Sequence, residues 1–346
     1  MDHSSDRLLL REILRRVSRS FYLTLAVLPS NVRDQVGLAY IFARTADTIA
    51  DAGSLDHCTR LGCLRQFKQC FIASKIDVEN LVAIRQLVID RFQRASERAL
   101  LEELVHGFEI YERLLPADRQ DIARLLPTLI DGMIFDLCQF PEVNGQTTVT
   151  ALPSMAELDY YTYAVAGCVG EFWTRMMCRH RPRLSGWDRQ AMAREGIRFG
   201  KGLQLINVLR DLPEDVRRGR CYIPASLLAE VGLSPQDLLD GKADSAFRPI
   251  FRRLILTARD HLDHGWLYTM MIPRAEIRLR LACMWPLLIG LRTLHKLWEA
   301  PTILAPAEPI KISRGEVYRI VAATTLTGGC GYVGTAYWGS LRKRLA

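Results

Sequence analysis

Most of the chain carries apolar residues at the spacing that places them on one face of an α-helix. Residues at i, i+3 and i+4 share a side of a helix, whereas a half-buried strand alternates apolar and polar side chains. Alternating runs of that kind are nearly absent from this sequence. The helical spacing recurs in Leu8–Val17, Val32–Ile49, Val82–Phe92, Leu100–Leu114, Ile122–Cys138, Tyr160–Cys178, Trp187–Leu212, Ile250–Met271 and Ala275–Glu299. We therefore expect an all-α fold, with many helices around a central cavity.

Several prolines fall between these segments, where helices are expected to stop. They are Pro29, Pro116, Pro141, Pro153, Pro182 and Pro224. The residues Ser154 to Glu157 have the pattern of a capping box, which would open the helix that contains Tyr160. No stretch rich in proline, glycine or serine divides the chain, so we expect a single domain over residues 1–346.

The composition narrows the class of ligand. The chain has 346 residues, 49% of them apolar and 24% charged, so it can bury a substantial core. Its formal net charge of +8 suits an anionic ligand or an anionic membrane surface. No helix-turn-helix, RRM or zinc-finger pattern accompanies this charge, which argues against nucleic acid as a partner. The sequence leaves the oligomeric state open.

The nine cysteines form no CxxC pair and follow no Cys/His metal spacing, which predicts reduced core thiols in a cytoplasmic protein. The first residues are acidic and an arginine-rich helix follows, so we expect no signal peptide. No strongly apolar span of about 20 residues is present. The tail at about 320–346 has an uncharged stretch rich in glycine and threonine. It is expected to be packed, disordered or in peripheral contact with the inner face of a membrane.

Two pairs of aspartates, Asp47 with Asp51 and Asp211 with Asp215, each stand four residues apart. Four residues advance about 400° along a helix, so both carboxylates of a pair project from one face, one turn apart. Adjacent like charges repel each other, and a bare pair is poorly stable unless cations bridge it. Hard oxygen ligands that share substrate phosphates are how Mg²⁺ is usually held, so a diphosphate is the predicted substrate.

The first pair has basic and hydroxyl-bearing companions. Arg44 lies three residues before Asp47 on the same helical side, where it can orient that carboxylate or bind a phosphate. Upstream, Ser18-Arg19-Ser20-Phe21 offers a guanidinium and two hydroxyls for a phosphate, although an ordinary helix cap is the alternative.

The second pair belongs to a polar stripe on an otherwise apolar helix. Gln204 and Asn207 precede Asp211 and Asp215 at three- and four-residue steps. A buried polar stripe needs partners, which a cation with a diphosphate or a hydrogen-bond network between helices would supply. Pro213 is expected to interrupt the stripe and leave Asp215 at the end of the helix. Three arginines just beyond would close over an anion or be solvated: Arg217, Arg218 and Arg220.

These blocks resemble those of the squalene/phytoene synthase family, the head-to-head prenyl diphosphate synthases. The shared blocks occur in the family's order and cover roughly residues 16–225: Ser18–Phe21, Tyr40–Asp51, Gly132–Leu137, Val165–Gly170 and Gln204–Pro224. The resemblance implies an isoprenoid-synthase helical bundle and a Mg²⁺-dependent coupling of two C15 or C20 allylic diphosphates. Relatives often carry another acid after the first aspartate motif, where this chain has Ala52.

The resemblance also assigns a role to one tyrosine. In squalene synthases the tyrosine four residues before the Val-Ala-Gly triplet takes part in the first half-reaction, and that position is Tyr161. A tyrosine on an apolar helix is otherwise more often a core residue bonded through its hydroxyl. Ala166, Gly167 and Gly170 would let a neighbouring helix or a ligand come close.

A reductant site is implied in the C-terminal part of the chain, beyond these blocks. The segment Ile310–Val317 resembles a Lys-Ile-Arg-Lys-Gly stretch that squalene synthases use for NADPH, with Lys311 and Arg314 suited to a phosphate-bearing cofactor. A solvated basic turn explains the same residues equally well. No glycine-rich nucleotide-binding loop follows a strand elsewhere in the chain.

The expected activity is that of a squalene synthase, which condenses two farnesyl diphosphates through presqualene diphosphate and reduces the product with NADPH. The alternatives are a dehydrosqualene or phytoene synthase without reductant, an enzyme that makes only presqualene diphosphate or hydroxysqualene, and a non-enzymatic protein that kept the fold. The predicted ligands of Mg²⁺, or of Mn²⁺ in its place, are Asp47, Asp51, Asn207, Asp211 and Asp215. The predicted diphosphate-binding residues are Ser18, Arg19, Ser20, Phe21, Tyr40, Arg44, Gln204, Asn207, Arg210 and Arg220.

Overall fold

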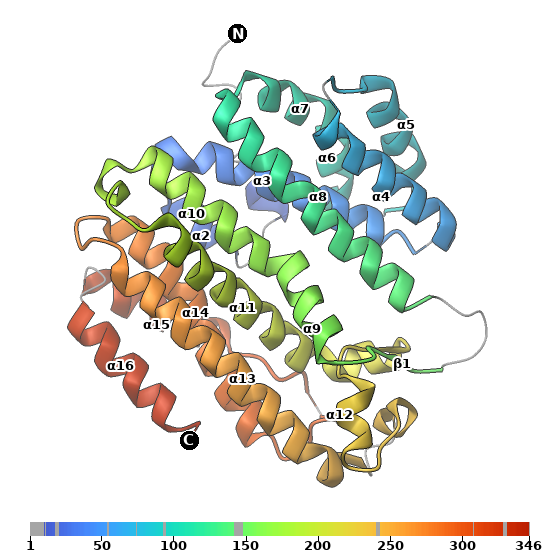
Figure 1. Ribbon diagram of the computed structural model, residues 1–346, viewed down its shortest axis with the longest axis vertical. Coiled ribbons are helices and arrows are strands. Elements are labelled where there is room, and N and C mark those ends of the chain that lie inside the picture. Colours follow the sequence, from blue (N-terminus) through green and yellow to red (C-terminus); the bar gives the residue numbers. More distant parts are fainter. Residues whose placement is uncertain are drawn as a thin grey trace. The chain divides into compact units, whose positions relative to one another are not determined.

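The computed structural model describes residues 10, 12–17, 21–53, 55–73, 75–92, 95–141, 148–239, 243–306, 308–327 and 331–345 (Figure 1). For residues 21 and 331–333 it describes the backbone alone. The regular secondary structure of the described residues is helical, apart from a short parallel pairing of β1 (Thr150–Ala151) with β2 (Arg220–Cys221). The predicted all-α fold is confirmed.

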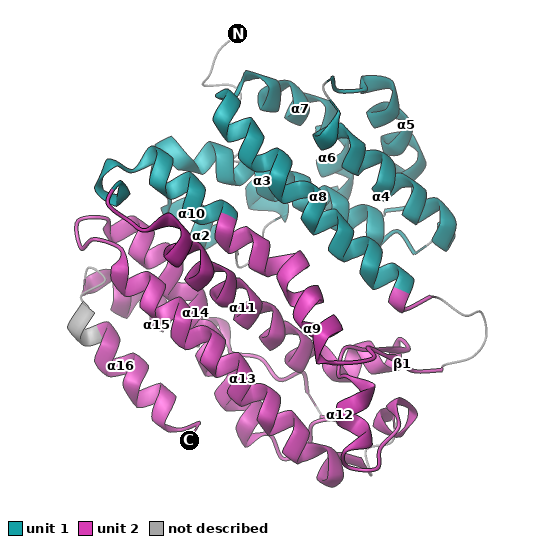
Figure 2. Cartoon of the chain, viewed as in Figure 1, with its two compact units in different colours: residues 1–138, 172–185 teal, residues 139–171, 186–346 magenta. Residues whose placement is uncertain are grey.

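Figure 2 divides the chain into two compact units, of which unit 1 comprises residues 1–138 and 172–185. Its helices are α2 (Phe21–Val27), α3 (Ser30–Ala50), α4 (His57–Ile72), α5 (Val78–Ile89), α6 (Ala95–Glu102), α7 (Leu104–Arg113), α8 (Pro116–Gln139), most of α10 (Cys168–His180) and the short η2 (Pro182–Leu184). The predicted single domain over residues 1–346 stays a prediction.

An aromatic cluster forms the core of unit 1 beneath α3. The Phe42 ring lies 4.6 Å from Phe108 and 5.2 Å from Phe71, measured between ring centroids. Phe67 and Tyr111 complete the cluster with edge-on contacts to Phe71. These side chains come from α3, α4 and α7, so burial of their rings fixes α3 against both neighbours.

A buried charge network ties the start of α8 to the end of α10 within unit 1. Asp118 accepts hydrogen bonds from Arg179 at 3.0 Å and lies 2.8 Å from the His180 ring nitrogen. Asp121 accepts from Arg179 at 2.5 Å and pairs with Arg175 at 3.0 Å. Since both aspartates are buried, this network is expected to be costly to break on one side.

Unit 2 comprises residues 139–171 and 186–346. Its elements are β1, α9 (Met155–Thr162), the π-helix η1 (Tyr163–Gly167), α11 (Arg189–Arg217), β2, α12 (Ala225–Ala229), η3 (Pro235–Leu239), α13 (Asp244–Met271), α14 (Ile277–Glu299), α15 (Arg314–Leu326) and α16 (Gly331–Lys343). The long helix α11 packs against α13, α14, α9 and η1, which places it at the centre of this unit.

Where α11 passes η1 and the start of α10, the backbones nearly touch. A Cβ added to Gly170 would lie 1.9 Å from the Gly196 carbonyl oxygen, and one on Gly200 would lie 2.3 Å from the Ala166 oxygen. Only glycine leaves room for such a crossing. The predicted close approach at this motif is therefore confirmed, and the π-helix that accompanies it was not predicted.

Most helix boundaries lie where the sequence predicts them, and two differences have a physical reason. The predicted capping box is present, since Ser154 accepts from Ala156 and Glu157 accepts from the Ser154 amide. The helix predicted to end near Leu212 continues through Pro213 to Arg217. The proline lacks an N–H group and so removes one hydrogen bond near the helix end, which the last turn tolerates. The helix α4 was not predicted, because its apolar residues are interrupted by arginine, lysine and glutamine.

The described part of the predicted tail is packed helix. Trp338 stacks on Trp266 with centroids 4.8 Å apart, and Trp285 donates a hydrogen bond to Thr324 at 2.9 Å. The His295 ring contacts the Leu341 carbonyl at 2.6 Å. Among the described helices, none is long and apolar enough to cross a membrane.

The eight described cysteines are free thiols, as the sequence predicts. Burial raises the pKa of Cys70 to about 11 and the pKa values of Cys221 and Cys283 to about 12. Such thiols stay protonated and unreactive at neutral pH.

Candidate active site

The first carboxylate pair sits at the C-terminal end of α3, in unit 1. Asp47 lies in the last turn with 41% of its side chain exposed, and Asp51 is the exposed C-cap residue. The Asp51 amide donates to the Asp47 carbonyl at 2.9 Å, so the helical turn between them is intact. The predicted one-face arrangement of the two residues therefore rests on a continuous helix.

The position of this pair is electrostatically unfavourable without a cation. The C-terminal end of a helix carries a partial negative charge, which repels carboxylates. No basic residue occupies the last turn of α3. Arg44, one turn earlier, forms an ion pair with Asp47 and also lies 3.6 Å from a Glu97 oxygen. The predicted Arg44–Asp47 contact is thus present.

A buried arginine from α4 supports the same helix end. Arg60 is only 1% exposed, and its guanidinium donates to the Ala50 carbonyl at 3.2 Å. This carbonyl is one of those left without an intrahelical partner where α3 ends. Sequence reasoning missed Arg60, because an isolated arginine at the start of a weakly patterned helix carries no spacing signal.

Two other residues predicted to bind the diphosphate are Tyr40, on α3, and Phe21, on α2. The Tyr40 hydroxyl donates to the Val17 carbonyl at 3.5 Å, which ties α3 to the preceding helical segment. Phe21 begins α2, but its side chain is outside the described part of the structure. Ser18, Arg19 and Ser20 lie outside the described residues.

The second carboxylate pair sits at the C-terminal end of α11, in unit 2. Arg210 donates two hydrogen bonds to the Asp211 carboxylate, at 2.7 and 2.5 Å. These bonds, with the nearby charge of Asp215, raise the pKa of Arg210 although burial opposes the shift. Asp211 keeps 43% of its side chain exposed, so one face of the clasped carboxylate remains open to a ligand.

The chain turns sharply after this pair. The Arg218 amide donates to the Asp215 carbonyl at 2.9 Å, and Gly219 follows with a φ of +81°. A left-handed residue at this point is a common way to end a helix and favours glycine. Arg220 then enters β2 beside Thr150, half-buried, while Arg217 and Arg218 are exposed.

The polar stripe on α11 is connected to Tyr161. Asn207 donates to Gln204 at 3.3 Å, and Gln204 donates to the Tyr161 hydroxyl at 3.4 Å. The Tyr161 ring is 8% exposed and stacks on Tyr222, with centroids 4.7 Å apart and planes at 24°. The hydrogen-bond network considered from the sequence is therefore present, and it includes the tyrosine proposed for catalysis.

Two more residues were not predicted: Lys201 extends the stripe by one turn, and Tyr222 stacks on Tyr161. Lys201, three residues before Gln204, forms an ion pair with Asp159 of α9. Its stem would be 3.0 Å from a Cβ at Gly167, so it passes beside the π-helix. The helical spacing from Lys201 to Gln204 was a usable signal for the lysine, and Tyr222 lies in a block that already matched the family.

The predicted cofactor segment forms the beginning of α15. Ser313 is the N-cap, and its hydroxyl accepts from the Glu316 amide at 3.2 Å while Glu316 accepts from the Ser313 amide at 2.9 Å. Hydrogen bonds from Lys296, and others in this cap, lower the pKa of Glu316 to about 2. Lys311 and Arg314 are exposed beside this cap.

Within the described residues, no group of three or more His, Cys, Asp and Glu side chains could hold a metal ion alone. A divalent cation at either aspartate pair would therefore need additional oxygen ligands. Substrate phosphates commonly supply them for Mg²⁺, whose sites in proteins use one or two carboxylates. The donor chemistry of both pairs fits this role.

Comparison with known proteins gives these sites a context. The chain is 30% identical over 244 residues to the presqualene diphosphate synthase of Zymomonas mobilis, covering 70% of this chain and 69% of that one. It is 29% identical over 256 residues to the phytoene synthase of Arthrospira platensis, covering 72% and 71%. For a bifunctional lycopene cyclase/phytoene synthase of Arthroderma gypseum, the identity is 28% over 70% of this chain. The match spans 39% of that longer relative.

Solved structures show the same fold. The complex of TcSQS with the ligand E5700 aligns with a TM-score of 0.76 at 21% identity, covering 98% of this chain and 91% of that one. A dehydrosqualene synthase in complex with a ligand aligns with a TM-score of 0.64 at 18% identity, covering 93% and 96%. Residues 14–316 match the family described as squalene/phytoene synthase. The chain therefore belongs to the squalene/phytoene synthase family.

Proposed function

We propose that the protein condenses two farnesyl diphosphates head to head into presqualene diphosphate and reduces this intermediate with NADPH to squalene. The observation that carries the proposal is the repeated arrangement at the ends of α3 and α11. Each end presents an aspartate pair, and in each pair the first aspartate is held by an arginine of the same helix. This arrangement suits a ligand that brings both cations and phosphate oxygens.

The residues that would hold Mg²⁺, or Mn²⁺ in its place, are Asp47, Asp51, Asn207, Asp211 and Asp215. When bound, the cations would neutralise the diphosphate leaving group and so favour its departure. The fit rests on hard oxygen donors and, at α3, on the negative helix end that lacks a basic residue in its last turn.

Arg44 and Arg210 have a second task in this proposal. Each neutralises an aspartate of its own helix, and each guanidinium carries more N–H groups than one carboxylate uses. We propose that these groups turn to phosphate oxygens when a diphosphate binds, and we assign Tyr40, Gln204 and Arg220 to the same task. The residues Ser18 to Phe21 are assigned to the same task by the family resemblance alone.

The reaction begins when the C–O bond of one farnesyl diphosphate breaks, leaving an allylic cation and free diphosphate. The double bond of the second farnesyl chain attacks this cation, and loss of a proton closes the cyclopropane ring. We assign a part in this proton transfer to the Tyr161 hydroxyl or to the released diphosphate itself, whose oxygens can accept the proton. Gln204 orients the hydroxyl and Tyr222 fixes the ring, which are the conditions that proton transfer requires.

The reductive step is assigned to the α15 end of unit 2, where Lys311 and Arg314 would receive the phosphate groups of NADPH. The relatives of higher identity favour a second candidate, because their names are presqualene diphosphate synthase and phytoene synthase. In that alternative the aspartate pairs act identically and no reductant is used. We further propose that the enzyme works in the cytoplasm, at the inner face of a membrane that takes up its product.

Product analysis separates these candidates. Purified protein is given farnesyl diphosphate and Mg²⁺, with and without NADPH, and a parallel sample receives geranylgeranyl diphosphate. Squalene with NADPH and presqualene diphosphate without it are expected. Presqualene diphosphate, hydroxysqualene or dehydrosqualene under both conditions would remove the reductive step, and phytoene from the C20 substrate would replace the C15 assignment. No product from either substrate would refute the proposed activity altogether.

A further inference from the structure

The tip of the helical hairpin formed by α13 and α14 exposes large apolar side chains. Leu267 and Met271 follow each other by one turn on α13 and are 56% and 60% exposed, and Ile277 begins α14 with 42% exposed. The connection between the helices spans only residues 272–276. Three apolar side chains therefore lie within two helical turns of one hairpin tip, where water would surround them.

The exposed charge at the same tip is positive. Arg274 and Arg278 are exposed, whereas Glu276 is buried. The buried Glu276 is the N-cap residue of α14 and offsets the partial positive charge of this helix end, so the exposed positive charge comes from the two arginines. We call Leu267, Met271, Arg274, Ile277 and Arg278 the α13–α14 tip.

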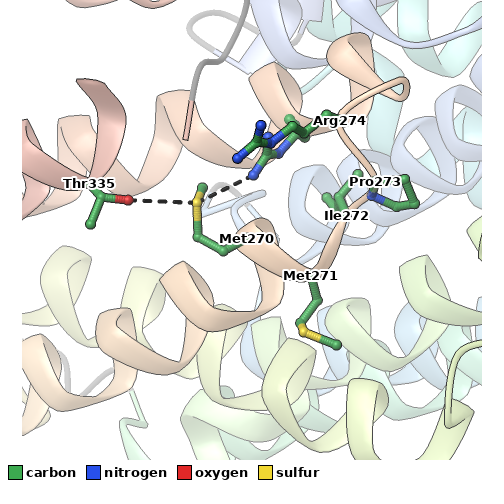
Figure 3. A pocket seen from close by; sticks show the side chains of 7 residues that line it. Met270, Met271, Ile272, Pro273, Arg274 and Thr335 are labelled. Atoms are coloured by element: carbon green, nitrogen blue, oxygen red, sulfur yellow. Dashed lines mark hydrogen bonds between the residues drawn. The ribbon is translucent and has the colours of Figure 1, made fainter. Parts of the chain in front are cut away.

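Met271 and Arg274 of the tip also line a surface pocket of about 580 Å³ with mostly apolar walls. Figure 3 shows the Met270 sulfur reached by the Thr335 hydroxyl of α16, while the Met271 side chain extends away from it. Arg280 donates to the same sulfur at 3.4 Å. Methionine side chains adapt to irregular apolar partners, which a lipid chain would provide.

We propose that the α13–α14 tip is a membrane-binding surface that inserts Leu267, Met271 and Ile277 among lipids with anionic headgroups. Charge complementarity identifies this occupant, because Arg274 and Arg278 attract anionic headgroups while the apolar side chains enter the acyl boundary. Long arginine side chains can keep their charge at the headgroups while their stems cover apolar surface. This inference does not rest on the proposed enzymatic function.

Vesicle flotation without any substrate tests the inference. The full chain is mixed with vesicles of phosphatidylcholine and phosphatidylglycerol, or of phosphatidylcholine alone. The protein is expected to float with the anionic vesicles, and high salt should release part of the bound protein. The double variant Leu267→Asp with Met271→Asp should bind the vesicles at least about tenfold more weakly, because two apolar side chains are no longer available for transfer from water into the lipid. Arg274→Glu with Arg278→Glu should lose the preference for anionic lipid.

A matched control distinguishes the tip from exposed apolar residues in general. Leu87 on α5 is 48% exposed and belongs to unit 1, so Leu87→Asp should leave flotation unchanged. Circular dichroism of each variant shows that it is folded. The inference is refuted if the wild-type protein ignores both kinds of vesicle or if the Leu267/Met271 double variant floats as well as wild type. It is equally refuted if that variant converts a lipid-free dimer into a monomer, which would assign the tip to a second copy of the chain.

Discussion

At the scale of single residues, the carboxylates of the candidate site are already partly neutralised by arginines. Asp47 pairs with Arg44, and Asp211 receives two hydrogen bonds from Arg210. The spacing of Arg44 predicted the first contact. The second was not predictable from spacing, because adjacent residues point to different sides of a helix and the Arg210 side chain has to bend round to its neighbour.

Removing one carboxylate charge from either pair should stop turnover without unfolding the protein. We expect Asp47→Asn and Asp211→Asn each to lower kcat by at least about a hundredfold, the usual effect of losing one group that stabilises the transition state. Helical circular dichroism should be retained. The control Asp90→Asn changes a carboxylate that is 80% exposed and should keep full activity. Unfolding of the two site variants would make the carboxylates structural.

The Tyr161 hydroxyl offers a test that separates chemistry from packing. In Tyr161→Phe the ring can still stack on Tyr222. The free energy of unfolding should therefore stay within about 1 kcal/mol of the wild-type value. Formation of presqualene diphosphate should fall by about a hundredfold or more, because a positioned proton-transfer group is lost. A rate close to that of wild type would return Tyr161 to the role of a core residue bonded through its hydroxyl.

At the scale of elements, the ends and crossings of helices determine where the site residues stand. The capping box of α9 and most helix positions were predictable, since local spacing and capping chemistry act within a few residues. The π-helix was not predictable, because it lies against α11, which is distant in the sequence. The Arg60 contact was not predictable either, because an isolated arginine carries no spacing signal. The family resemblance identified Gly167 and Gly170 at the crossing, but it did not identify α11 as the helix that packs against them.

Arg60 should hold the end of α3 in place. Replacing it by methionine removes the hydrogen bond to the Ala50 carbonyl and should lower the free energy of unfolding by about 1–3 kcal/mol. If the first carboxylate pair depends on this helix end, the Mg²⁺ concentration for half-maximal activity should rise as well. Arg65→Met, at an exposed position of the same helix, is the matched control. A loss of stability with an unchanged Mg²⁺ requirement would limit Arg60 to folding.

The crossing of α11 with α10 should reject even a methyl group. Gly170→Ala would place a carbon within 1.9 Å of the Gly196 oxygen, so the helices must separate. We expect the free energy of unfolding, measured in urea, to fall by about 3 kcal/mol or more, which is the upper end of the cost of overpacking. Gly62→Ala, in open space on α4, should instead stabilise the protein by about 0.5–1 kcal/mol. Equal effects of the two substitutions would contradict the close crossing.

At the scale of the whole molecule, the predicted site residues are divided between two compact units. The first carboxylate pair lies in unit 1, whereas the second pair, Tyr161 and the α15 segment lie in unit 2. The order of motifs along the chain predicted the family and the fold. It could not predict that residues 172–185 join the earlier unit, because the break falls inside the continuous helix α10.

Global stability should fall on mild acidification because of a buried histidine. Burial, together with the charges of Arg198 and Lys201, lowers the pKa of His261 to about 4, from 6.5 in the unfolded chain. The unfolded state therefore binds the extra proton first, and stability is lost as the pH falls from 6.5 towards 4. The full shift corresponds to about 3 kcal/mol, since each pKa unit is worth about 1.4 kcal/mol.

Urea unfolding of wild type and His261→Gln at pH 7, 5.5 and 4.5 checks this expectation. Glutamine can still accept the hydrogen bond that Arg198 donates to the ring, and it does not titrate. The variant should lose less stability than wild type over this range. Part of the dependence should remain, because burial also lowers the pKa of His295. Parallel curves for the two proteins would assign the acid sensitivity to other groups.

The distribution of thiols has a practical consequence for measuring these events. Of the eight described cysteines, Cys58 and Cys138 are exposed and the others are buried. Among the described cysteines, a maleimide dye should therefore react first at these two positions. Cys58 stands two residues before Arg60, on the helix that supports the first carboxylate pair. With Cys138 and Cys330 replaced by serine, a fluorophore on Cys58 would report by its emission when a cation reaches that end of α3.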